Sequence, residues 1–182
     1  MRERIPAQPT RCVSPTPVVS VDTSNGPRAG RVYVTWGTTS LNRSQDIAIA
    51  AFDPNLKPLL GVGEVAQVNP REGIRGPDEF LPASTVDPKT GRLWVCYYLS
   101  HGVERRAARY ACTASSDGGG SWSWPRVAAS RTSNENVRKA NRANGYGDYE
   151  GVAAFGGVAH PVWTDGRALA RLREEVFTAR VR

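Results

Sequence analysis

The sequence predicts an all-β protein made of repeated four-stranded units, and two observations carry this prediction. A glycine-led strand pattern occurs three times, as GRVYVTW at residues 30–36, GRLWVCY at 91–97 and GVAHPVW at 157–163, with offsets of 61 and 66 residues. The chain of 182 residues contains 18 Gly, 13 Pro and 40% hydrophobic residues, which suits a turn-rich β domain. A period of this length indicates an array of supersecondary units rather than a single hairpin.

Each copy of the pattern lies between two further predicted strands. An apolar run precedes it and forms an innermost strand, which ends at Asp22, Asp87 and Gly156 in the three copies. A third strand is expected behind it, at residues 46–51, 109–115 and 175–181. Turn residues separate the first two strands of the first two copies, so these pairs are predicted hairpins.

Residues 115–122 read SSDGGGSW and match the spacing S-x-D-x-G-x-x-W. Ser115 and Asp117 can direct their side-chain oxygens at backbone N–H groups of a tight turn, and Gly119 allows a positive φ. Trp122 then packs as an apolar plug. The spacing therefore predicts a specific turn after the third strand of the second copy.

This spacing resembles the Asp-box, or BNR repeat, of sialidase-like β-propellers, which closes the hairpin between the third and fourth strands of a blade. The resemblance covers about residues 16–181 and implies an incomplete sialidase-like propeller of about three four-stranded blades, with the last one truncated. The family's box is structural rather than catalytic. The first copy keeps only Asp53 of the box, and the third copy reaches the end of the sequence where its box should begin.

The blades divide the chain into five segments. We expect a lead-in from a preceding blade at 1–15, blade 1 at 16–70, blade 2 with the Asp-box at 71–132, a basic loop at 133–147, and an incomplete blade 3 at 148–182. Closed propellers contain about four to eight blades, so three blades are too few. We expect either a piece of a longer chain, a homodimer that completes a ring, or an open half that is stable in another way.

The three cysteines admit two interpretations. A hairpin that turns over residues 101–106 places Cys96 opposite Cys112, because the numbers of paired residues should sum to about 207 or 208. Directly opposed cysteines can approach disulfide distance, but cross-strand bridges are often strained, so two free thiols in the core are favoured over a disulfide. Cys12 stays unpaired in either case.

The net charge of +7 permits acidic partners without establishing one. The arginines are spread along the chain, and their one local concentration falls in the basic loop, at Arg131, Arg138, Lys139 and Arg142. No helix-turn-helix, zinc-finger or aromatic RNA-binding pattern accompanies them, so no nucleic-acid partner is predicted.

No apolar run approaches the length of a membrane span, and the first ten residues contain no apolar signal-peptide region. The family resemblance implies an extracellular or cell-surface location, although the chain as given shows no signal peptide.

The topology of a blade sorts the candidate functional residues. Its strands alternate in direction, so the loop before strand one and the loop between strands two and three emerge on one face, and the 115–122 turn emerges on the other. The first face is expected to gather Arg43, Asp78, Glu79, His101, Asp148, Tyr149, Glu150, Asp165 and Arg167.

The resemblance implies that this face holds an arginine cluster for a substrate carboxylate, an acid/base carboxyl, and a tyrosine nucleophile assisted by a glutamate. Guanidinium groups pair well with carboxylates, and a glycosidase needs a carboxyl that protonates the leaving oxygen. The catalytic candidates are Asp148, Tyr149, Asp165 and Arg167. The substrate-binding candidates are Glu150, His101 and Arg43.

The catalytic set is incomplete in this sequence. Tyr149 and Glu150 are neighbours that point to opposite sides of an extended strand, so they cannot form the tyrosine–glutamate pair together. No three arginines match the family's triad, and the Arg-Ile-Pro at residues 4–6 lies too far before the first inner strand. A structural interpretation also fits: Trp163 fills the gap between blades, Asp165 caps a turn and Arg167 bridges to a neighbour.

Two further features complete the sequence picture. Residues 167–175 contain strong helix formers with helical spacing of apolar residues, which predicts a short helix in the loop before the last strand. No pair of histidines or cysteines has metal-ligand spacing, and no phosphate or dinucleotide motif occurs, so neither a metal site nor a cofactor is predicted.

The sequence therefore predicts a propeller module that binds a glycan or another extracellular polymer through its loop face and is catalytically incomplete. An exo-acting glycosidase of the sialidase type, with its other catalytic residues outside this chain, is the alternative. A protein-interaction propeller is the second alternative.

Overall fold

The computed structural model describes residues 3–39, 44–60, 66–68, 76–135, 145–147, 149–167 and 175–182. Every regular element within these ranges is a β-strand. The strands are β1 (Glu3–Ile5), β2 (Gln8–Val13), β3 (Val18–Val21), β4 (Val32–Thr39), β5 (Gln45–Phe52), β6 (Pro58–Leu60), β7 (Ala66–Gln67), β8 (Glu79–Val86), β9 (Leu93–His101), β10 (Ala107–Ser115), β11 (Arg126–Val127), β12 (Gly151–Phe155), β13 (Val158–Asp165) and β14 (Glu175–Thr178).

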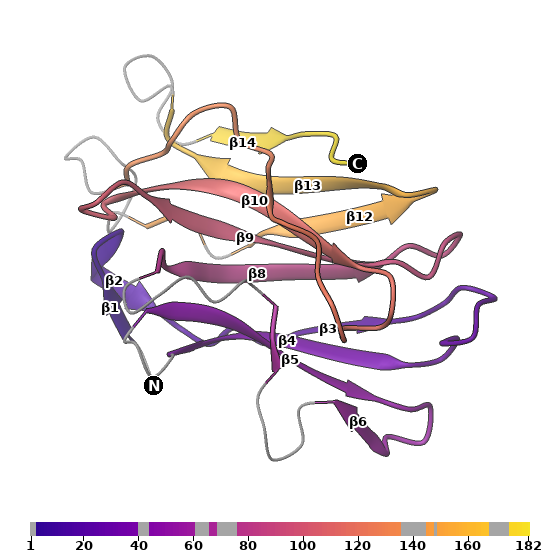
Figure 1. The fold of residues 1–182 in the computed structure, drawn as a ribbon. Coiled ribbons are helices and arrows are strands. Elements are labelled where there is room, and N and C mark those ends of the chain that lie inside the picture. The colour runs from indigo at the N-terminus through magenta and orange to yellow at the C-terminus, as the bar shows by residue number, and fades with distance from the viewer. Residues whose placement is uncertain are drawn as a thin grey trace.

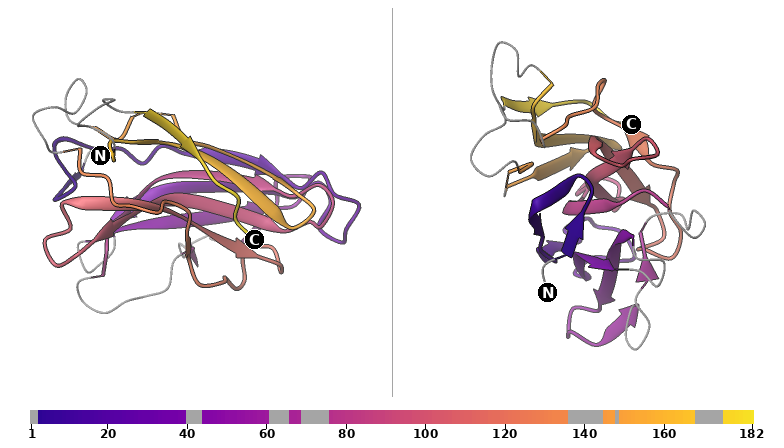
Figure 2. Two further views of the ribbon diagram at one scale, coloured as in Figure 1. Left: turned by 90° about the horizontal axis from the view of Figure 1, so that it is seen from above. Right: turned by 90° about the vertical axis from the view of Figure 1, so that its left-hand side faces the viewer.

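Three antiparallel meanders form the body of the molecule. Their strand orders are β3-β4-β5-β6, with β7 also pairing with β5, then β8-β9-β10-β11, and β12-β13-β14. The innermost strands lie together, because β8 packs against both β3 and β12, and the three sheets follow one another through the molecule (Figures 1 and 2). This arrangement is an incomplete propeller of three blades, and the fold class predicted from the sequence is confirmed.

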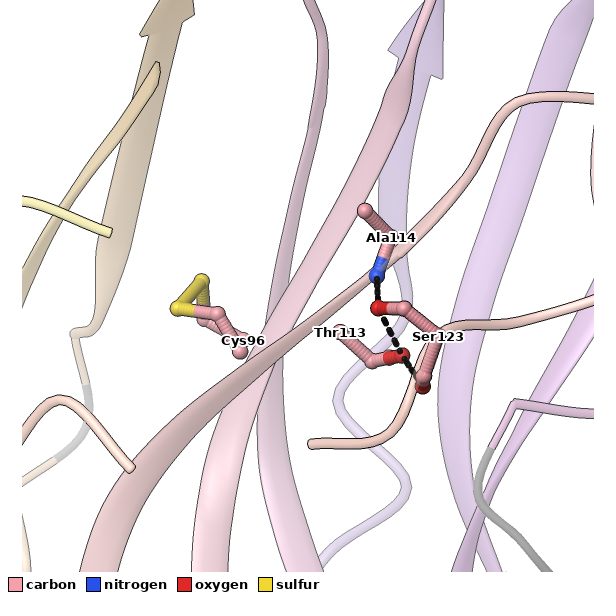
Figure 3. The surroundings of a disulfide bond; sticks show 5 residues. Cys96, Thr113, Ala114 and Ser123 are labelled. Atoms are coloured by element: carbon pink, nitrogen blue, oxygen red, sulfur yellow. Dashed lines mark hydrogen bonds between the residues drawn. A yellow bond between two sulfur atoms is a disulfide. The ribbon is translucent and has the colours of Figure 1, made fainter. Parts of the chain in front are cut away.

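The predicted inner, second and third strands all form, in the predicted order. The register of the β9–β10 hairpin is also as predicted, because Tyr98 pairs with Tyr110 and Cys96 with Cys112. The two opposed cysteines are joined by a disulfide (Figure 3), so the disulfide alternative is the correct one. Cys12 is free.

The larger hydrophobic core lies between the second and third sheets. An aromatic chain crosses it, with Phe80 stacked on Tyr98, Tyr98 edge-on to Tyr110, and Tyr110 stacked on Trp163 at ring-centroid distances of 5.3, 4.9 and 5.2 Å. Such ring pairs add to the stability given by burial alone. The β1–β2 hairpin packs onto the same core through apolar residues that include Ile5, Ala7 and Val13.

A second core joins the first sheet to the second. It contains Tyr33, Ile47 and Ile49 from the first sheet and Leu93 and Tyr97 from the second. Hydroxyl contacts extend it to the inner strands, where the Ser20 and Ser84 oxygens lie 2.6 Å apart. Each interface between sheets is therefore buried, and the middle sheet is covered on both faces.

The 115–122 turn is held by its own side chains. Ser115 donates a hydrogen bond to Asp117 and accepts one from the Gly119 N–H at 2.8 Å. Asp117 accepts backbone hydrogen bonds from Gly120 and Ser121 at 3.0 Å each. The Ser121 hydroxyl and backbone bonds hold the pKa of Asp117 well below its usual value. Gly119 has a φ of 100°, which explains why glycine is needed there.

A simpler version of this turn follows β5. Asp53 accepts backbone hydrogen bonds from Asn55 and Lys57 at 2.9 and 2.8 Å. In the second sheet, Thr113 and Ala114 instead bind Ser123, which anchors the chain after the turn (Figure 3).

The helix predicted around residues 167–175 lies almost wholly outside the described residues. No helix in the part of the chain that the structure describes is long and apolar enough to cross a membrane.

Candidate functional site on the loop face

The two ends of the stacked sheets differ in what they carry (Figure 1). One end, here called the loop face, carries the loop between β9 and β10 and the starts of β8 and β12. The other end carries the short turns that follow β3, β8 and β12. The Gly118 backbone of the 115–122 turn approaches Arg28 and Arg31 of the turn after β3, so this turn lies at the second end.

Asp165 and Arg167 belong to one hydrogen-bonded network. Asp165 is 1% exposed, accepts hydrogen bonds from the Trp163 indole N–H at 3.1 Å and the Arg167 backbone N–H at 2.7 Å, and pairs with the Arg167 guanidinium. Arg167 also donates to the Ser130 hydroxyl at 2.9 Å and lies 4.2 Å from the centre of the Phe177 ring. Both side chains are therefore occupied by contacts within the protein.

A second network, which the sequence did not indicate, supports the first. The buried Glu135 accepts hydrogen bonds from the Ser133 hydroxyl and from the Gly166 N–H, the latter at 2.9 Å. The Tyr146 hydroxyl donates to the Ser133 carbonyl at 2.8 Å. Burial, followed by the nearby Glu135 charge, raises the pKa of Tyr146. The two networks together hold the backbone of Gly166 and Arg167, which directly follow β13.

The neighbours Tyr149 and Glu150 have different surroundings. Tyr149 is 91% exposed. Glu150 is half-buried, and its charge adds to burial in raising the pKa values of Tyr98 and Tyr110. His101 is exposed at the end of β9. Asp148 and Arg43 lie outside the described residues.

Asp78 is a buried carboxyl at the start of the second sheet. It is 1% exposed, accepts a hydrogen bond from the Gln45 N–H at 3.1 Å and pairs with Arg105 at 3.3 Å. Burial raises its pKa, and the bonds from Gln45 and Arg105 act in the opposite direction. The adjacent Glu79 is also buried.

A groove at this end lies beside Trp36. Its volume is about 450 Å³, and its lining residues are Val13, Pro15, Trp36, Gly37, Thr38, Thr39 and Gln45. The Gln45 amide donates to the Thr39 hydroxyl at 2.8 Å, which fixes both groups at the groove wall. The groove thus combines one half-buried indole with hydroxyl and amide groups. Among the residues described, no group of three potential metal ligands occurs.

Comparison with solved structures supports the propeller architecture. The structure matches a Hadza microbial sialidase, Hz136, with a TM-score of 0.56 and 14% identity over 91% of this chain and 34% of that chain. It matches a thermostable family-43 glycoside hydrolase with a TM-score of 0.50 and 13% identity over 90% of this chain and 50% of that chain. The chain has a sialidase-like propeller fold.

These similarities concern the fold, and the chain spans about a third to a half of the length of the structures it matches. No family model matches the sequence, and no curated protein matches it significantly.

The Trp36 groove was missed because its walls come from distant parts of the chain. Trp36 was recognised only as the end of a strand pattern, and Val13 and Pro15 belong to a segment that the sequence assigned to a lead-in. The residues of β4 alternate in burial, and this alternation identifies the face of the strand that carries Trp36. Its even-numbered residues, including Val34 and Trp36, are only half-buried, whereas Tyr33 and Thr35 are buried.

Proposed function

We propose that this chain is a propeller module that binds a glycan in the Trp36 groove, at the loop-face end of the first sheet, and does not hydrolyse it. The observation that carries the proposal is the composition of the groove. A sugar ring has an apolar face of C–H groups and an edge of hydroxyls, and the groove offers an indole beside Thr38, Thr39 and Gln45. Its volume of about 450 Å³ lies within the range of about 300–1,000 Å³ typical of small-molecule sites.

The occupied side chains of Asp165 and Arg167 support binding without catalysis. A clamp for a substrate carboxylate needs guanidinium N–H groups that point into solvent. Arg167 instead pairs with Asp165, donates to Ser130 and stacks on Phe177. Asp165 is in turn committed to Trp163 and Arg167, which suits a structural role rather than proton transfer.

An exo-acting glycosidase of the sialidase type is the second candidate. Burial raises the pKa of Asp78, which is the direction of shift that a glycosidase general acid needs. The two solved structures named above are a sialidase and a glycoside hydrolase, which adds weight to a carbohydrate ligand under either proposal. The remaining catalytic residues of such an enzyme would lie outside this chain.

Hydrolysis of fluorogenic glycosides separates the two candidates. We expect no turnover of a sialoside by the purified chain, together with binding to a panel of immobilised oligosaccharides. Turnover that disappears in Asp148→Asn or Asp78→Asn, while circular dichroism shows an intact β fold, would establish the glycosidase. Silence of the whole panel with capture of a defined protein partner would establish the protein-interaction alternative.

Several sequence-derived expectations belong to the same proposal. We assign the 115–122 turn as an Asp-box that stabilises blade 2, and the segments 1–15, 16–70, 71–132, 133–147 and 148–182 as the lead-in, the blades and the basic loop. An exported, extracellular location fits a glycan ligand. The proposal includes no nucleic-acid partner.

A homodimer that closes the ring competes with the glycan groove. The face of the first sheet that carries Trp36 also exposes Val19 and Val21, and the outer face of the third sheet exposes Phe155 and Val162. A second copy packed on the first face would cover Trp36. Light scattering distinguishes the two, because the groove proposal expects a mass near 19.8 kDa and ring closure by two copies expects twice that mass.

A further inference from the structure

Gly37 is a glycine inside a strand, and it lines the Trp36 groove. It belongs to β4 and pairs with Ile47 of β5 in a continuous register. A glycine inside a strand weakens the strand, and it often marks a bulge, a bend, or a place where a ligand or another backbone comes close. The reason for a glycine at this position is therefore informative.

The usual structural reasons for a glycine do not apply to Gly37. Its φ is not positive, so its backbone conformation is open to other residues. A Cβ atom on Gly37 would have its three nearest neighbours at 3.6, 3.7 and 3.9 Å, which are ordinary van der Waals distances. Neither backbone strain nor the approach of another chain segment requires a glycine here, which leaves the approach of a ligand.

Three oxygen atoms surround the position that this Cβ would occupy. The carbonyl oxygens of Pro15 and Ser14 lie 3.6 and 3.7 Å from it, and Gln45 Oε1 lies 3.9 Å from it. The Pro15 oxygen accepts the Gly37 N–H at 2.7 Å, and the Ser14 oxygen accepts the Thr16 hydroxyl at 3.2 Å. A carbonyl oxygen has two lone pairs, so both of these oxygens can accept a further hydrogen bond.

The amide of Gln45 is held in place through its donors. Its backbone N–H donates to Asp78 at 3.1 Å, and its Nε2 donates to the Thr39 hydroxyl at 2.8 Å. Both bonds leave the lone pairs of Oε1 available to a ligand. Pro15, Gly37 and Gln45 all line the Trp36 groove, so the space between the three oxygens adjoins it.

The number of acceptors indicates which chemical group fits this space. A hydroxyl or an amide N–H brings one donor, and a carboxylate brings none. An ammonium group brings three donors, and hydrogen bonds from a charged group are about twice as strong as those between neutral groups. A cluster of three acceptor oxygens therefore matches an ammonium group best.

We propose that the Trp36 groove selects sugars with a free amino group, whose ammonium donates hydrogen bonds to the Ser14, Pro15 and Gln45 oxygens beside Gly37. This inference rests on the proposed glycan groove and names the class of its ligand, amino sugars rather than neutral or acidic ones. The net charge of +7 opposes non-specific attraction of a cationic sugar, so a preference for an amino sugar reports a local site.

Three matched trisaccharides test the ligand class. Trimers of glucosamine, N-acetylglucosamine and glucose with the same linkage differ only in one ring substituent. In isothermal titration below the pKa of the amine, the glucosamine trimer should bind about tenfold to a hundredfold more tightly than the glucose trimer, the effect of a charge-assisted hydrogen bond. The N-acetylglucosamine trimer should have no such advantage.

The outcomes separate this inference from the proposed function. Equal affinities of the three trimers would overturn the inference and leave the groove as a glycan site. Failure of every sugar to bind would overturn the proposed function and the inference together.

Two glycine substitutions locate the contact. Gly37→Ala places a methyl group among the three oxygens without a close contact, so the fold should persist and the preference for the glucosamine trimer should disappear. Gly151→Ala is the matched control, because Gly151 lies in β12, does not line the groove, and has no described atom within 4 Å of a Cβ. An unchanged preference in a folded Gly37→Ala variant, or an equal loss in Gly151→Ala, would contradict the assignment.

A third substitution should act in the opposite direction. Gln45→Glu replaces a neutral acceptor with a carboxylate of similar shape, to which the Thr39 hydroxyl can donate. The preference for the glucosamine trimer over the glucose trimer should rise by about tenfold, because the ammonium then meets a charged acceptor. A smaller preference than that of the wild type, in a variant whose circular dichroism is unchanged, would contradict the contact with Gln45.

Discussion

The carboxylate of Asp87, at the end of β8, accepts the backbone N–H of Gly157 in the next sheet at 2.5 Å. Its other oxygen accepts the N–H groups of Gly156 and Lys89 at 3.1 and 2.9 Å. One buried side chain therefore holds its own turn and the turn of the neighbouring blade. These hydrogen bonds link the second and third sheets at the turn end.

Removal of the Asp87 carboxylate should destabilise the protein. In Asp87→Ala the N–H groups of Lys89, Gly156 and Gly157 lose their acceptor, and unsatisfied buried donors cost about 1–3 kcal/mol. We expect the free energy of unfolding, measured by urea denaturation, to fall by about 2–3 kcal/mol. Asp53→Ala is the control, because Asp53 caps an exposed turn within one sheet and its loss should cost less than 1 kcal/mol, roughly the value of an exposed cap. Equal costs for the two variants would contradict a role between blades.

The same carboxylate should make the stability depend on pH. Burial alone would raise the pKa of Asp87, but the hydrogen bonds led by that from Gly157 outweigh it and lower the pKa. A lowered pKa gives stability that is fully present above the unfolded value of about 3.9 and is lost as the pH falls through the folded value. The stability difference between wild type and Asp87→Asn should therefore shrink as urea denaturation is repeated from about pH 5 downward. A difference that is constant or grows on acidification would refute this.

The disulfide between Cys96 and Cys112 should contribute substantially to stability. It closes a loop with a sequence separation of 16, for which the loss of unfolded-state entropy corresponds to about 3 kcal/mol. We expect the double variant Cys96→Ala/Cys112→Ala to unfold at lower urea concentration and to be insensitive to reductant. Cys12→Ser should keep the wild-type response to reductant. Mass spectrometry that finds three free thiols in the native protein would contradict the bond.

Arg167 should matter for folding rather than for ligand binding. Removing one partner of a buried ion pair leaves an uncompensated charge, so Arg167→Ala should cost about 3 kcal/mol through the stranded Asp165. Arg106→Ala is the control, because the Arg106–Glu104 pair is exposed and such pairs contribute about 0–1 kcal/mol. Loss of glycan binding by a well-folded Arg167→Ala variant would contradict the structural assignment.

The sequence was most informative where structure depends on neighbours along the chain. Alternating apolar residues and turn residues determine a hairpin locally, which is why the β9–β10 register, with Cys96 opposite Cys112, could be predicted. The disulfide itself was not predicted from the sequence. The 115–122 turn is likewise stabilised by side chains within a few residues of the groups they bind.

The candidate site was harder to predict because its contacts join distant residues. The partner of Arg167 at Ser130 is 37 residues away, and the Trp36 groove depends on the path of residues 13–15. The sequence could not show which of the predicted loop-face side chains form their hydrogen bonds within the protein. That distinction requires coordinates, and it turns Asp165 and Arg167 from catalytic candidates into structural ones in our proposal.

The most direct test of the account is the affinity of two tryptophan variants for the oligosaccharide that binds the wild-type chain best. Trp36 lines the groove, whereas Trp124 is 72% exposed just before β11, outside it. Isothermal titration should show that Trp36→Ala weakens binding by about tenfold or more, the contribution expected of an aromatic ring that stacks on a ligand, and that Trp124→Ala does not. Equal affinities for wild type and a folded Trp36→Ala variant would show that the groove is not the glycan site.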